Sequence, residues 1–531
     1  MSAAPYGSDQ AMTAAAFPGA PPPAIELVGI NKRFGSVQAN RDVSLRVGKG
    51  TIHGIIGENG AGKSTLMSIV YGFYEADGGE IRIDGAKVAI RNSADAIAAG
   101  IGMVHQHFML VESFSVLENV MLGAEGGALL KEGQDKARAE LLRLGQEFGL
   151  TVDPDARIAD LPVGDQQRVE ILKALFRHCS ILILDEPTGV LTPQETDQLF
   201  RILSALKARG VTVLLITHKL KEVLAITDNV TVMRGGAVVA DRRTADTDAQ
   251  ELAELMVGRK VRLELDKTPA SPRDVELAVE GLSLVDDRGV TRLHDITFDL
   301  RAGEIVGIAG VSGNGQSELL ETLAGIRHPS GGRIRLQDAV VMATQPSDPA
   351  AMRALGLAHV PEDRHRLGIV TGFPAWESSV LGYQRDPDLG GRFLLDRTAM
   401  TARCEKLMQG FDVRPPLPQL GSAKFSGGNQ QKLILAREMA CQPRVLLIGQ
   451  PTRGVDIGAI EFIHREIIAL RDRGVAVLLV SVELDEILAL ADRILVMNQG
   501  RIVGEIAGAD ADERQLGLMM TGSAETLRVA S

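Results

Sequence analysis

The chain is poor in cysteine and in aromatic residues. Its 531 residues include three cysteines, and aromatic residues make up 4% of the total. Cys179, Cys404 and Cys441 are too few and too widely spaced for a disulfide framework or a four-ligand zinc site. Their scarcity excludes both kinds of site and favours a reducing compartment.

Long apolar runs are also missing. The longest candidates, residues 211–216 and 475–480, have the length of buried strands, far short of the ~18 residues that a membrane span needs. The first 23 residues carry Asp9 and a proline cluster where a secretory signal would need an apolar segment, so we expect a disordered tail there. The chain is expected to be soluble by itself, and any membrane role must come through partners.

Positive charge is not in excess. Lys plus Arg is 57 and Asp plus Glu is 68, which gives a formal net charge of −11. Such a chain lacks the broad cationic surface of a duplex-binding protein, so no nucleic-acid partner is expected, although a local basic groove stays compatible with this balance. With 45% hydrophobic residues, general disorder is excluded. The length predicts three or four units of roughly 100–200 residues each.

What the chain does contain is an internal duplication. Four blocks of similar sequence recur in the same order, the first at an offset of 253 residues and the others at an offset of 264. The pairs are 41–66 with 294–319, 161–168 with 425–432, 181–192 with 445–456, and 211–224 with 475–488. Because chance similarity would not keep this order, the chain is predicted to hold two copies of one domain.

Each copy is predicted to be an α/β domain. Runs 52–56, 181–184 and 211–216 are apolar throughout, which is typical of parallel strands buried on both faces. Segments 133–149 and 166–177 have helix-forming composition and indicate a largely helical insert. The expected order is a tail over 1–23, a first domain over 24–260, a short charged linker over 261–273, a second domain over 274–522 and a tail over 523–531.

Residues 57–64, GENGAGKS, form a phosphate-binding pattern. They match G-x-x-x-x-G-K-[ST] between an apolar strand and a helical run at 65–70, the context in which this pattern carries meaning. The glycines let backbone N–H groups close around phosphate oxygens, and the helix N-terminus favours negative charge. We expect Lys63 to contact the β- and γ-phosphates and Ser64 to place its hydroxyl on Mg²⁺. A plain glycine turn is the alternative for this pattern taken alone.

An acidic motif, ILILDEP, ends the apolar strand at 181–184. Asp185 can organise Mg²⁺, and Glu186 can act as a general base on the attacking water. Gln106, in MVHQHF, is suited to sense Mg²⁺ and that water, while His218 can donate to a γ-phosphate. Taken singly, each could instead be a capping acid or a satisfied polar side chain. Their combination favours a nucleotide-hydrolysing site.

The order of these motifs resembles the nucleotide-binding domain of ATP-binding cassette (ABC) transporters. The resemblance covers about residues 24–522. It implies two tandem P-loop ATPase domains, each with a mostly parallel core sheet, a helical insert and an antiparallel β subdomain. It also implies that two such domains sandwich ATP head to tail, so that each phosphate loop faces the other domain's signature, usually LSGGQ.

The resemblance assigns roles to the matching residues. The implied cofactors are ATP and Mg²⁺; the catalytic residues would be Glu186, His218 and Gln106, and the Mg²⁺ ligands Ser64, Gln106 and Asp185. Phe34 is expected to stack on adenine, and Gln106 to couple the site to a permease. The residues implied in nucleotide binding are Phe34, Gly57, Glu58, Asn59, Gly60, Ala61, Gly62, Lys63, Ser64, Thr65, Ser426, Gly427, Gly428, Asn429 and Gln430.

The second copy departs from this pattern at nearly every catalytic position. Gln316 stands in the place of Lys63, and losing a charge-assisted phosphate contact removes about 1.5–3 kcal/mol. The position that corresponds to Phe34 lies near Asp287, and no aromatic residue occupies it. The other replacements are Glu362 for Gln106, Gly449 for Asp185, Gln450 for Glu186 and Val482 for His218.

The signatures show the opposite distribution. The second copy keeps an intact signature at 426–430, whereas the first has Pro162 where the phosphate-contacting serine belongs. Proline supplies neither a hydroxyl nor a backbone N–H. If the two halves pair within one chain, one site is complete and the other is defective. If two chains paired copy to copy instead, every site would contain a defective part. Random decay of one half is the alternative, although it would also have damaged the second signature.

A fused double cassette without membrane spans is similar to the ATPases of importers for simple sugars and nucleosides. Segments 105–111, 313–318 and 360–370 look closest to the nucleoside branch. The resemblance implies two separate transmembrane permease subunits, an extracytoplasmic substrate-binding lipoprotein, and a peripheral position on the cytoplasmic face of the cell membrane, with membrane contact only through the permeases. The main alternative is a soluble double-cassette ATPase acting on ribosomes, whose halves are generally joined by a long, charged helical linker and both stay competent.

Overall fold

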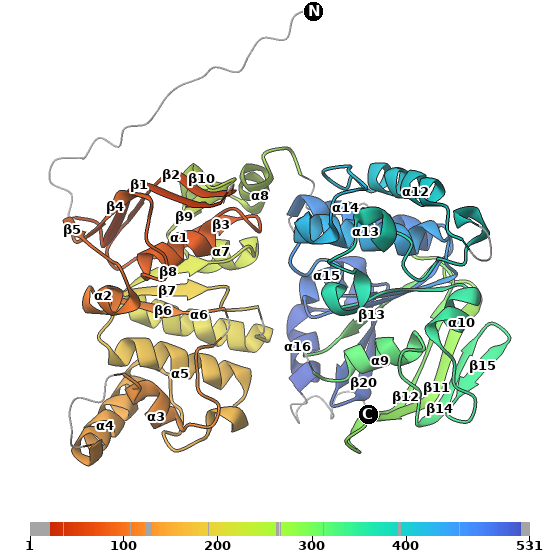
Figure 1. The fold of residues 1–531 in the computed structure, drawn as a ribbon. Helices are drawn as coiled ribbons and strands as arrows, with labels where there is room; N and C mark the ends of the chain where they lie inside the picture. Colours follow the sequence, from red (N-terminus) through yellow and green to blue (C-terminus); the bar gives the residue numbers. More distant parts are fainter. Residues whose placement is uncertain are drawn as a thin grey trace, which may run out of the picture.

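Two lobes, one from each half of the sequence, lie side by side in the computed structural model (Figure 1). The structure describes residues 22–35, 37–106, 108–123, 130–189, 191–261, 265, 267–311, 313–390, 394–455 and 457–521. Residues 1–21 of the predicted N-terminal tail, the whole C-terminal tail over 523–531, and residues 262–264 and 266 of the predicted linker lie outside this description.

The core of the first lobe is a six-stranded sheet in the order β10-β9-β3-β8-β7-β6. All its neighbouring strands are parallel except β9 and β10. Every residue of β3, β7 and β8 is buried, which confirms the buried strands predicted from apolar runs. The bounds are β3 Ile52–Gly57, β6 Ile101–Val104, β7 Ile181–Asp185, β8 Thr212–Ile216, β9 Asn229–Arg234 and β10 Ala237–Arg243.

An antiparallel sheet and a group of helices complete this lobe. The antiparallel sheet, in the order β2-β1-β4-β5, shares a hydrophobic core with α1 and with one face of the six-stranded sheet. Its strands are β1 Ile25–Phe34, β2 Val37–Val47, β4 Gly78–Ile83 and β5 Ala86–Val88. The helices are α1 Lys63–Val70, α2 Ser93–Ala98, α3 Val116–Met121, α4 Leu130–Phe148, α5 Val163–Phe176, α6 Pro193–Ala208, α7 Leu220–Ile226 and α8 Ala249–Val257. The expected helical insert corresponds to α3, α4 and α5.

The second lobe repeats this architecture, which confirms the predicted duplication and fold class. Its sheets run β16-β17-β18-β13-β19-β20 and β12-β11-β14-β15, the same orders as in the first lobe. The strands are β11 Val275–Val285, β12 Thr291–Arg301, β13 Ile305–Ala309, β14 Gly331–Leu336, β15 Ala339–Met342, β16 Leu357–Val360, β17 Val445–Gly449, β18 Ala476–Ser481, β19 Arg493–Asn498 and β20 Arg501–Ala507. The helices are α9 Gln316–Leu323, α10 Pro349–Ala354, α11 Ala375–Ser378, α12 Arg397–Gly410, α13 Gly427–Ala440, α14 Ile457–Asp472, α15 Leu484–Leu490 and α16 Glu513–Thr521.

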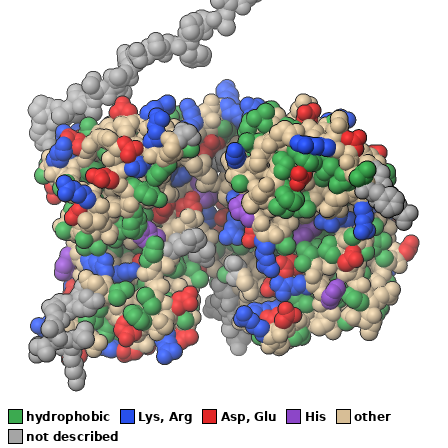
Figure 2. All heavy atoms as spheres, viewed as in Figure 1, with side chains coloured by type: hydrophobic (Ala, Val, Ile, Leu, Met, Phe, Trp, Pro, Cys, Tyr) green, Lys and Arg blue, Asp and Glu red, His purple; other side chains and the backbone are tan. Residues whose placement is uncertain are grey.

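The lobes meet through corresponding elements. Helix α6 contacts α16, and α14 contacts α8. At the offset of 264 residues α6 corresponds to α14 and α8 to α16, so the two contacts are equivalent. Gln194 Nε2 donates to the carbonyl oxygen of Arg514 at 3.1 Å, and Arg259 Nη1 lies 3.2 Å from Glu461 Oε2. Figure 2 shows the seam between the lobes as a hollow with charged side chains on its walls. The halves are therefore related by a pseudo-two-fold axis.

None of the helices that the structure describes has both the length and the apolar character needed to cross a membrane.

Candidate functional site

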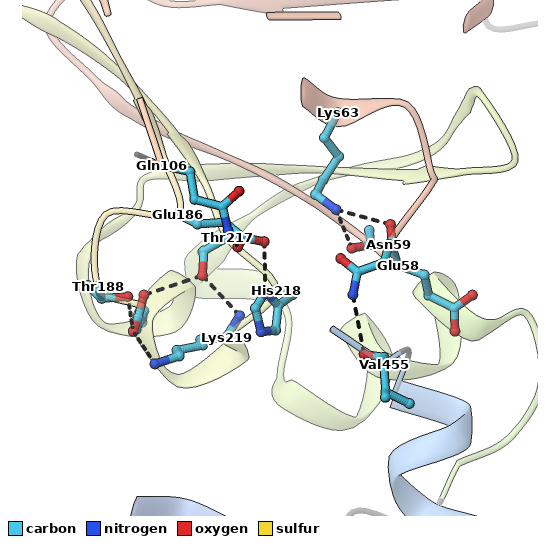
Figure 3. Close-up of polar contacts among 12 residues, drawn as sticks. Glu58, Asn59, Lys63, Gln106, Glu186, Thr188, Thr217, His218, Lys219 and Val455 are labelled. Atoms are coloured by element: carbon cyan, nitrogen blue, oxygen red, sulfur yellow. Dashed lines mark hydrogen bonds and ion pairs between the residues drawn. The ribbon is translucent and has the colours of Figure 1, made fainter. Parts of the chain in front are cut away.

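The phosphate loop connects β3 to α1 in the first lobe. Gly62 ends the loop with a φ of 97°, a left-handed conformation that favours glycine, and Asn40 Nδ2 donates to its carbonyl oxygen at 3.0 Å. Lys63 Nζ donates to the carbonyl oxygens of Gly57 at 2.7 Å and Glu58 at 3.1 Å (Figure 3). Burial of the Lys63 ammonium lowers its pKa, against the attraction of Glu186 and Asp185. The loop thus wraps around a buried cation.

The end of β7 brings two carboxylates to this loop. The Oδ1 atom of Asp185 is buried without a hydrogen-bond partner among the described residues. Burial raises the pKa of the Asp185 carboxyl, the neighbouring Glu186 raises it further, and the Ser64 hydroxyl lowers it. An unpaired buried carboxylate oxygen beside a serine hydroxyl fits Mg²⁺.

No group of three or more His, Cys, Asp or Glu side chains that could hold a metal ion occurs in the part of the chain that the structure describes. Mg²⁺ is commonly held by one or two carboxylates together with waters and substrate phosphates. The arrangement therefore suits a cation that arrives with a nucleotide.

The Glu186 carboxylate contacts two other side chains that the sequence assigned to the nucleotide site. Gln106 Nε2 donates to Glu186 Oε2 at 2.9 Å, and His218 Nδ1 lies 3.0 Å from Glu186 Oε1 (Figure 3). The bond to His218 lowers the pKa of Glu186 most, and the charges of Lys63 and Lys219 act in the same direction. The Glu186 backbone has a φ of 47°, a left-handed conformation that is unusual for a residue other than glycine. The arrangement presents an ionised carboxylate near the phosphate loop.

The aromatic residue expected to stack on adenine lies at the end of β1. Phe34 is 43% exposed, although the ring of Tyr74 packs edge-on against it at a centroid distance of 5.1 Å. Strand β2 leads from this hairpin to Asn40, which bonds the phosphate loop. One hairpin therefore connects an exposed ring to the phosphate loop.

The intact signature begins α13 in the second lobe. The Ser426 hydroxyl caps this helix by accepting from the Asn429 backbone N–H at 3.4 Å, and Asn429 Nδ2 donates to the same oxygen at 2.8 Å. Gln430 Nε2 donates to the Ser422 carbonyl at 3.0 Å. In the first lobe Pro162 occupies the cap position of α5 and makes no side-chain capping bond.

The first lobe's phosphate loop touches the second lobe beside this signature. A Cβ atom on Gly427 would lie 2.9 Å from the carbonyl oxygen of Gly454, so the signature and the Gly454–Val455 segment are in close contact. Asn59 Nδ2 donates to the Val455 carbonyl at 3.5 Å (Figure 3). Two predicted nucleotide-binding groups, at 57–65 and 426–430, are thereby brought to the same part of the seam.

In the second lobe, Glu362 contacts the equivalent loop and the end of β17. Gln316 Nε2 donates to the Val311 carbonyl at 3.1 Å, which partly repeats the Lys63 contacts without a charge. The Ser317 hydroxyl donates to Glu362, and a Cβ atom on Gly449 would lie 2.5 Å from Glu362 Cγ. Burial raises the pKa of Glu362. The glycine at 449 thus makes room for a carboxylate from the segment that follows β16.

Comparison with known proteins identifies the family. The family model described as "ABC transporter" matches residues 40–189 and again residues 293–453. The chain belongs to the ABC transporter family. This ABC protein is an ATPase, and the double match confirms that both halves are cassettes.

Curated relatives match the ABC protein along nearly its whole length. It is 43% identical to the nucleoside import ATP-binding protein NupA of Lactococcus lactis subsp. cremoris, over 94% of this chain and 98% of that protein. It is 44% identical to the guanosine import ATP-binding protein NupO of Bacillus subtilis, with the same coverage. The ribose import ATP-binding protein RbsA 1 of Rubrobacter xylanophilus is 40% identical over 94% of this chain and 99% of that protein.

Sequence reasoning missed some contacts of the site. It did not foresee that Glu362 would reach Ser317, nor that Lys219 would lie 3.0 Å from Glu483 across the seam. The sequence did contain a sign of the second contact, because residues 211–224 align with 475–488 and make Glu483 the equivalent of Lys219. The first had none, because it depends on how a loop turns in three dimensions.

Proposed function

We propose that this ABC ATPase energises the uptake of nucleosides or simple sugars through two separate permease subunits and an extracytoplasmic substrate-binding lipoprotein. In this proposal it lies at the cytoplasmic face of the membrane and touches it only through the permeases. The observation that carries the proposal is the length and identity of the match to NupA and NupO, whose names specify nucleoside and guanosine import. We place nucleosides ahead of sugars, although a ribose import protein is only slightly less similar.

We infer that the chain forms one complete ATP site from both lobes. The first lobe supplies the phosphate loop over 57–65, Asp185, Glu186, His218 and Phe34, and the second lobe supplies the signature over 426–430. The hydrogen bond from Asn59 to Val455 supports this pairing, because Val455 follows the glycine that packs against the signature.

In this site each side chain has a distinct task. Lys63 would exchange its carbonyl contacts for phosphate oxygens, and the Ser426 hydroxyl and α13 N-terminus would approach the γ-phosphate from the opposite side. Ser64, Asp185 and Gln106 would hold Mg²⁺, which when bound offsets negative charge on the phosphates. Glu186, kept ionised by His218, would take the proton from the attacking water.

The other pairing gives a site that is not expected to hydrolyse ATP. Gln450 has an amide where a general base is needed, and its Oε1 atom accepts from the Val482 backbone N–H at 3.2 Å. The facing signature carries Pro162 in place of its serine. Nucleotide binding without hydrolysis remains compatible with the surviving glycine-rich loop at 310–317.

The alternative function is that of a soluble double-cassette ATPase acting on ribosomes. Against it, the predicted linker spans only residues 261–273, and its Lys267 Nζ lies 2.7 Å from Asp492 Oδ1 in the second lobe. Only one of the two phosphate loops has a lysine. Both features differ from the long helical linker and two competent sites expected of that class.

The test is ATP hydrolysis by the ATPase reconstituted with its permeases and binding protein in membranes. Under the import proposal, binding protein loaded with a nucleoside should stimulate hydrolysis more than the same protein with a pentose. Stimulation by pentoses alone would move the substrate class to sugars. Co-sedimentation with ribosomes, without permease-dependent membrane association, would overturn the transporter function.

A further inference from the structure

Two ion pairs at the seam join corresponding residues of the two lobes. Lys219 Nζ lies 3.0 Å from Glu483 Oε2, and Lys221 forms an ion pair with Asp485. Lys219 precedes the first residue of α7, and Glu483 precedes the first residue of α15. At the offset of 264 residues, Lys219 corresponds to Glu483 and Lys221 to Asp485. Each of these residues therefore pairs with its own counterpart in the other lobe.

A residue that meets its own counterpart lies at the axis of a two-fold interface. The helices around the seam obey the same relation, since α6 packs on α16 and α14 on α8. The two pairs, here called the axis pairs, thus mark positions where a symmetric dimer would bring identical side chains together. In this chain the two copies carry opposite charges at both positions.

This arrangement distinguishes the three ways in which such lobes can associate. Two first lobes would place Lys219 and Lys221 against like charges, and two second lobes would do the same with Glu483 and Asp485. Opposite charges meet only when a first lobe pairs with a second lobe. Like charges facing each other across an interface suppress wrong partners by weakening their association.

The axis pairs suit selection better than they suit stabilisation. The side chains of Lys219 and Glu483 are 27% and 38% exposed, and those of Lys221 and Asp485 are 73% and 55% exposed. Ion pairs this exposed contribute little to affinity. A wrong association, however, loses the attraction and gains a repulsion at both positions, so the difference between right and wrong pairing is larger than the contribution of either pair.

We propose that the axis pairs direct the first lobe to pair with the second lobe of this chain and not with a second copy of itself. The proposal rests on the proposed composite site, because pairing like lobes would set the Lys63 loop against the signature that contains Pro162. The axis pairs begin one residue after His218, so they act next to the site whose assembly they select.

The test uses two full-length variants with complementary charge reversals. The basic variant is E483K/D485K and the acidic variant is K219E/K221D. Each alone should pair its lobes poorly, sediment more slowly than the wild type and hydrolyse ATP about tenfold more slowly, because both axis pairs become repulsive. An equimolar mixture should recover activity and form a species of twice the mass.

Zero-length carbodiimide cross-linking identifies the partners without requiring hydrolysis. In the wild type it should join Lys219 to Glu483 within one chain, and in the mixture it should join Lys219 of the basic variant to Glu483 of the acidic variant. The full swap, K219E/K221D/E483K/D485K, should restore a one-chain protein with wild-type sedimentation and shows that the reversed residues are tolerated by the fold.

The matched control is K136E/K406E, which changes the net charge as much as the acidic variant does but at exposed positions of α4 and α12. It should behave as the wild type. The proposal is overturned if each variant alone keeps wild-type sedimentation and activity, or if neither the mixture nor the full swap recovers. A wild-type chain that cross-links internally but hydrolyses no ATP would refute the proposed function and leave the axis pairs supported.

Discussion

Gln106 Nε2 lies 2.9 Å from Glu186 Oε2, while the other oxygen of that carboxylate faces His218. Both oxygens of the expected general base are therefore occupied by side chains from two different strand ends of the same sheet. Because Gln106 bonds Glu186 directly, a movement of Gln106 would break or strain this hydrogen bond. A permease that displaces this segment would thus change the position of the base itself.

Replacing Glu186 by Gln should stop turnover while keeping nucleotide bound. The change removes the proton acceptor but leaves the Lys63 loop intact, so steady-state ATP hydrolysis should fall by about 10²–10⁴-fold. Phosphate release measures turnover, and nucleotide retained after rapid gel filtration measures trapping. The matched control is Gln450→Ala in the second lobe, which should change turnover little. A comparable loss in both variants would contradict a single complete site.

Ser426→Ala should lower hydrolysis although residue 426 lies in the lobe without a general base. The hydroxyl is expected to contact the γ-phosphate held by the other lobe, and a hydrogen bond to a charged group contributes about 1.5–3 kcal/mol. The ATPase rate should fall roughly ten- to hundredfold. Because Ser426 also caps α13, thermal unfolding should be compared in parallel. Pro162→Ala is the control at the equivalent position and should leave the rate nearly unchanged.

Asp185→Asn should separate metal binding from folding. Asp185 Oδ1 is buried without a hydrogen-bond partner among the described residues, so its charge is poorly compensated when no metal is bound. Without Mg²⁺, the variant should unfold at a temperature equal to or above that of the wild type. With Mg²⁺ and ATP, the wild type should gain thermal stability and the variant should gain much less. Equal gains in both proteins would exclude Asp185 as a metal ligand.

Acidification should destabilise the first lobe through His53. This side chain is buried in β3, its Nε2 atom lies 2.7 Å from Thr231 Oγ1, and burial lowers its pKa from 6.5 to about 4. The unfolded chain takes up the proton first as the pH falls, so stability is lost between about pH 6.5 and pH 4. His53→Gln should remove about 2 kcal/mol of the loss between about pH 7 and pH 5.

Urea unfolding at several pH values checks the His53 prediction. His359 has a similarly lowered pKa of about 4 in the second lobe, and it provides the residual acid sensitivity of the variant. Parallel pH profiles for the wild type and His53→Gln would show that His53 does not carry the effect.

Local chemistry explains which features could be predicted from the sequence. The phosphate loop, the acidic strand end and the duplication depend on residue type and spacing within short segments. In the structure Lys63 bonds within its loop and Gln106 bonds Glu186, while the roles assigned to these residues stay predictions. The packing of Tyr74 on Phe34 and the reach of Glu362 to Ser317 join segments far apart in the chain, so spacing gives no access to them. The domain boundaries stay predictions.

The close approach of Glu362 to Gly449 couples these two positions of the second lobe. Restoring aspartate at 449 would bring its Cβ atom to 2.5 Å from Glu362 Cγ and 2.9 Å from Leu320 Cδ1. A side chain at 449 would therefore require Glu362 to shift, so the residues that positions 449 and 362 can carry depend on each other.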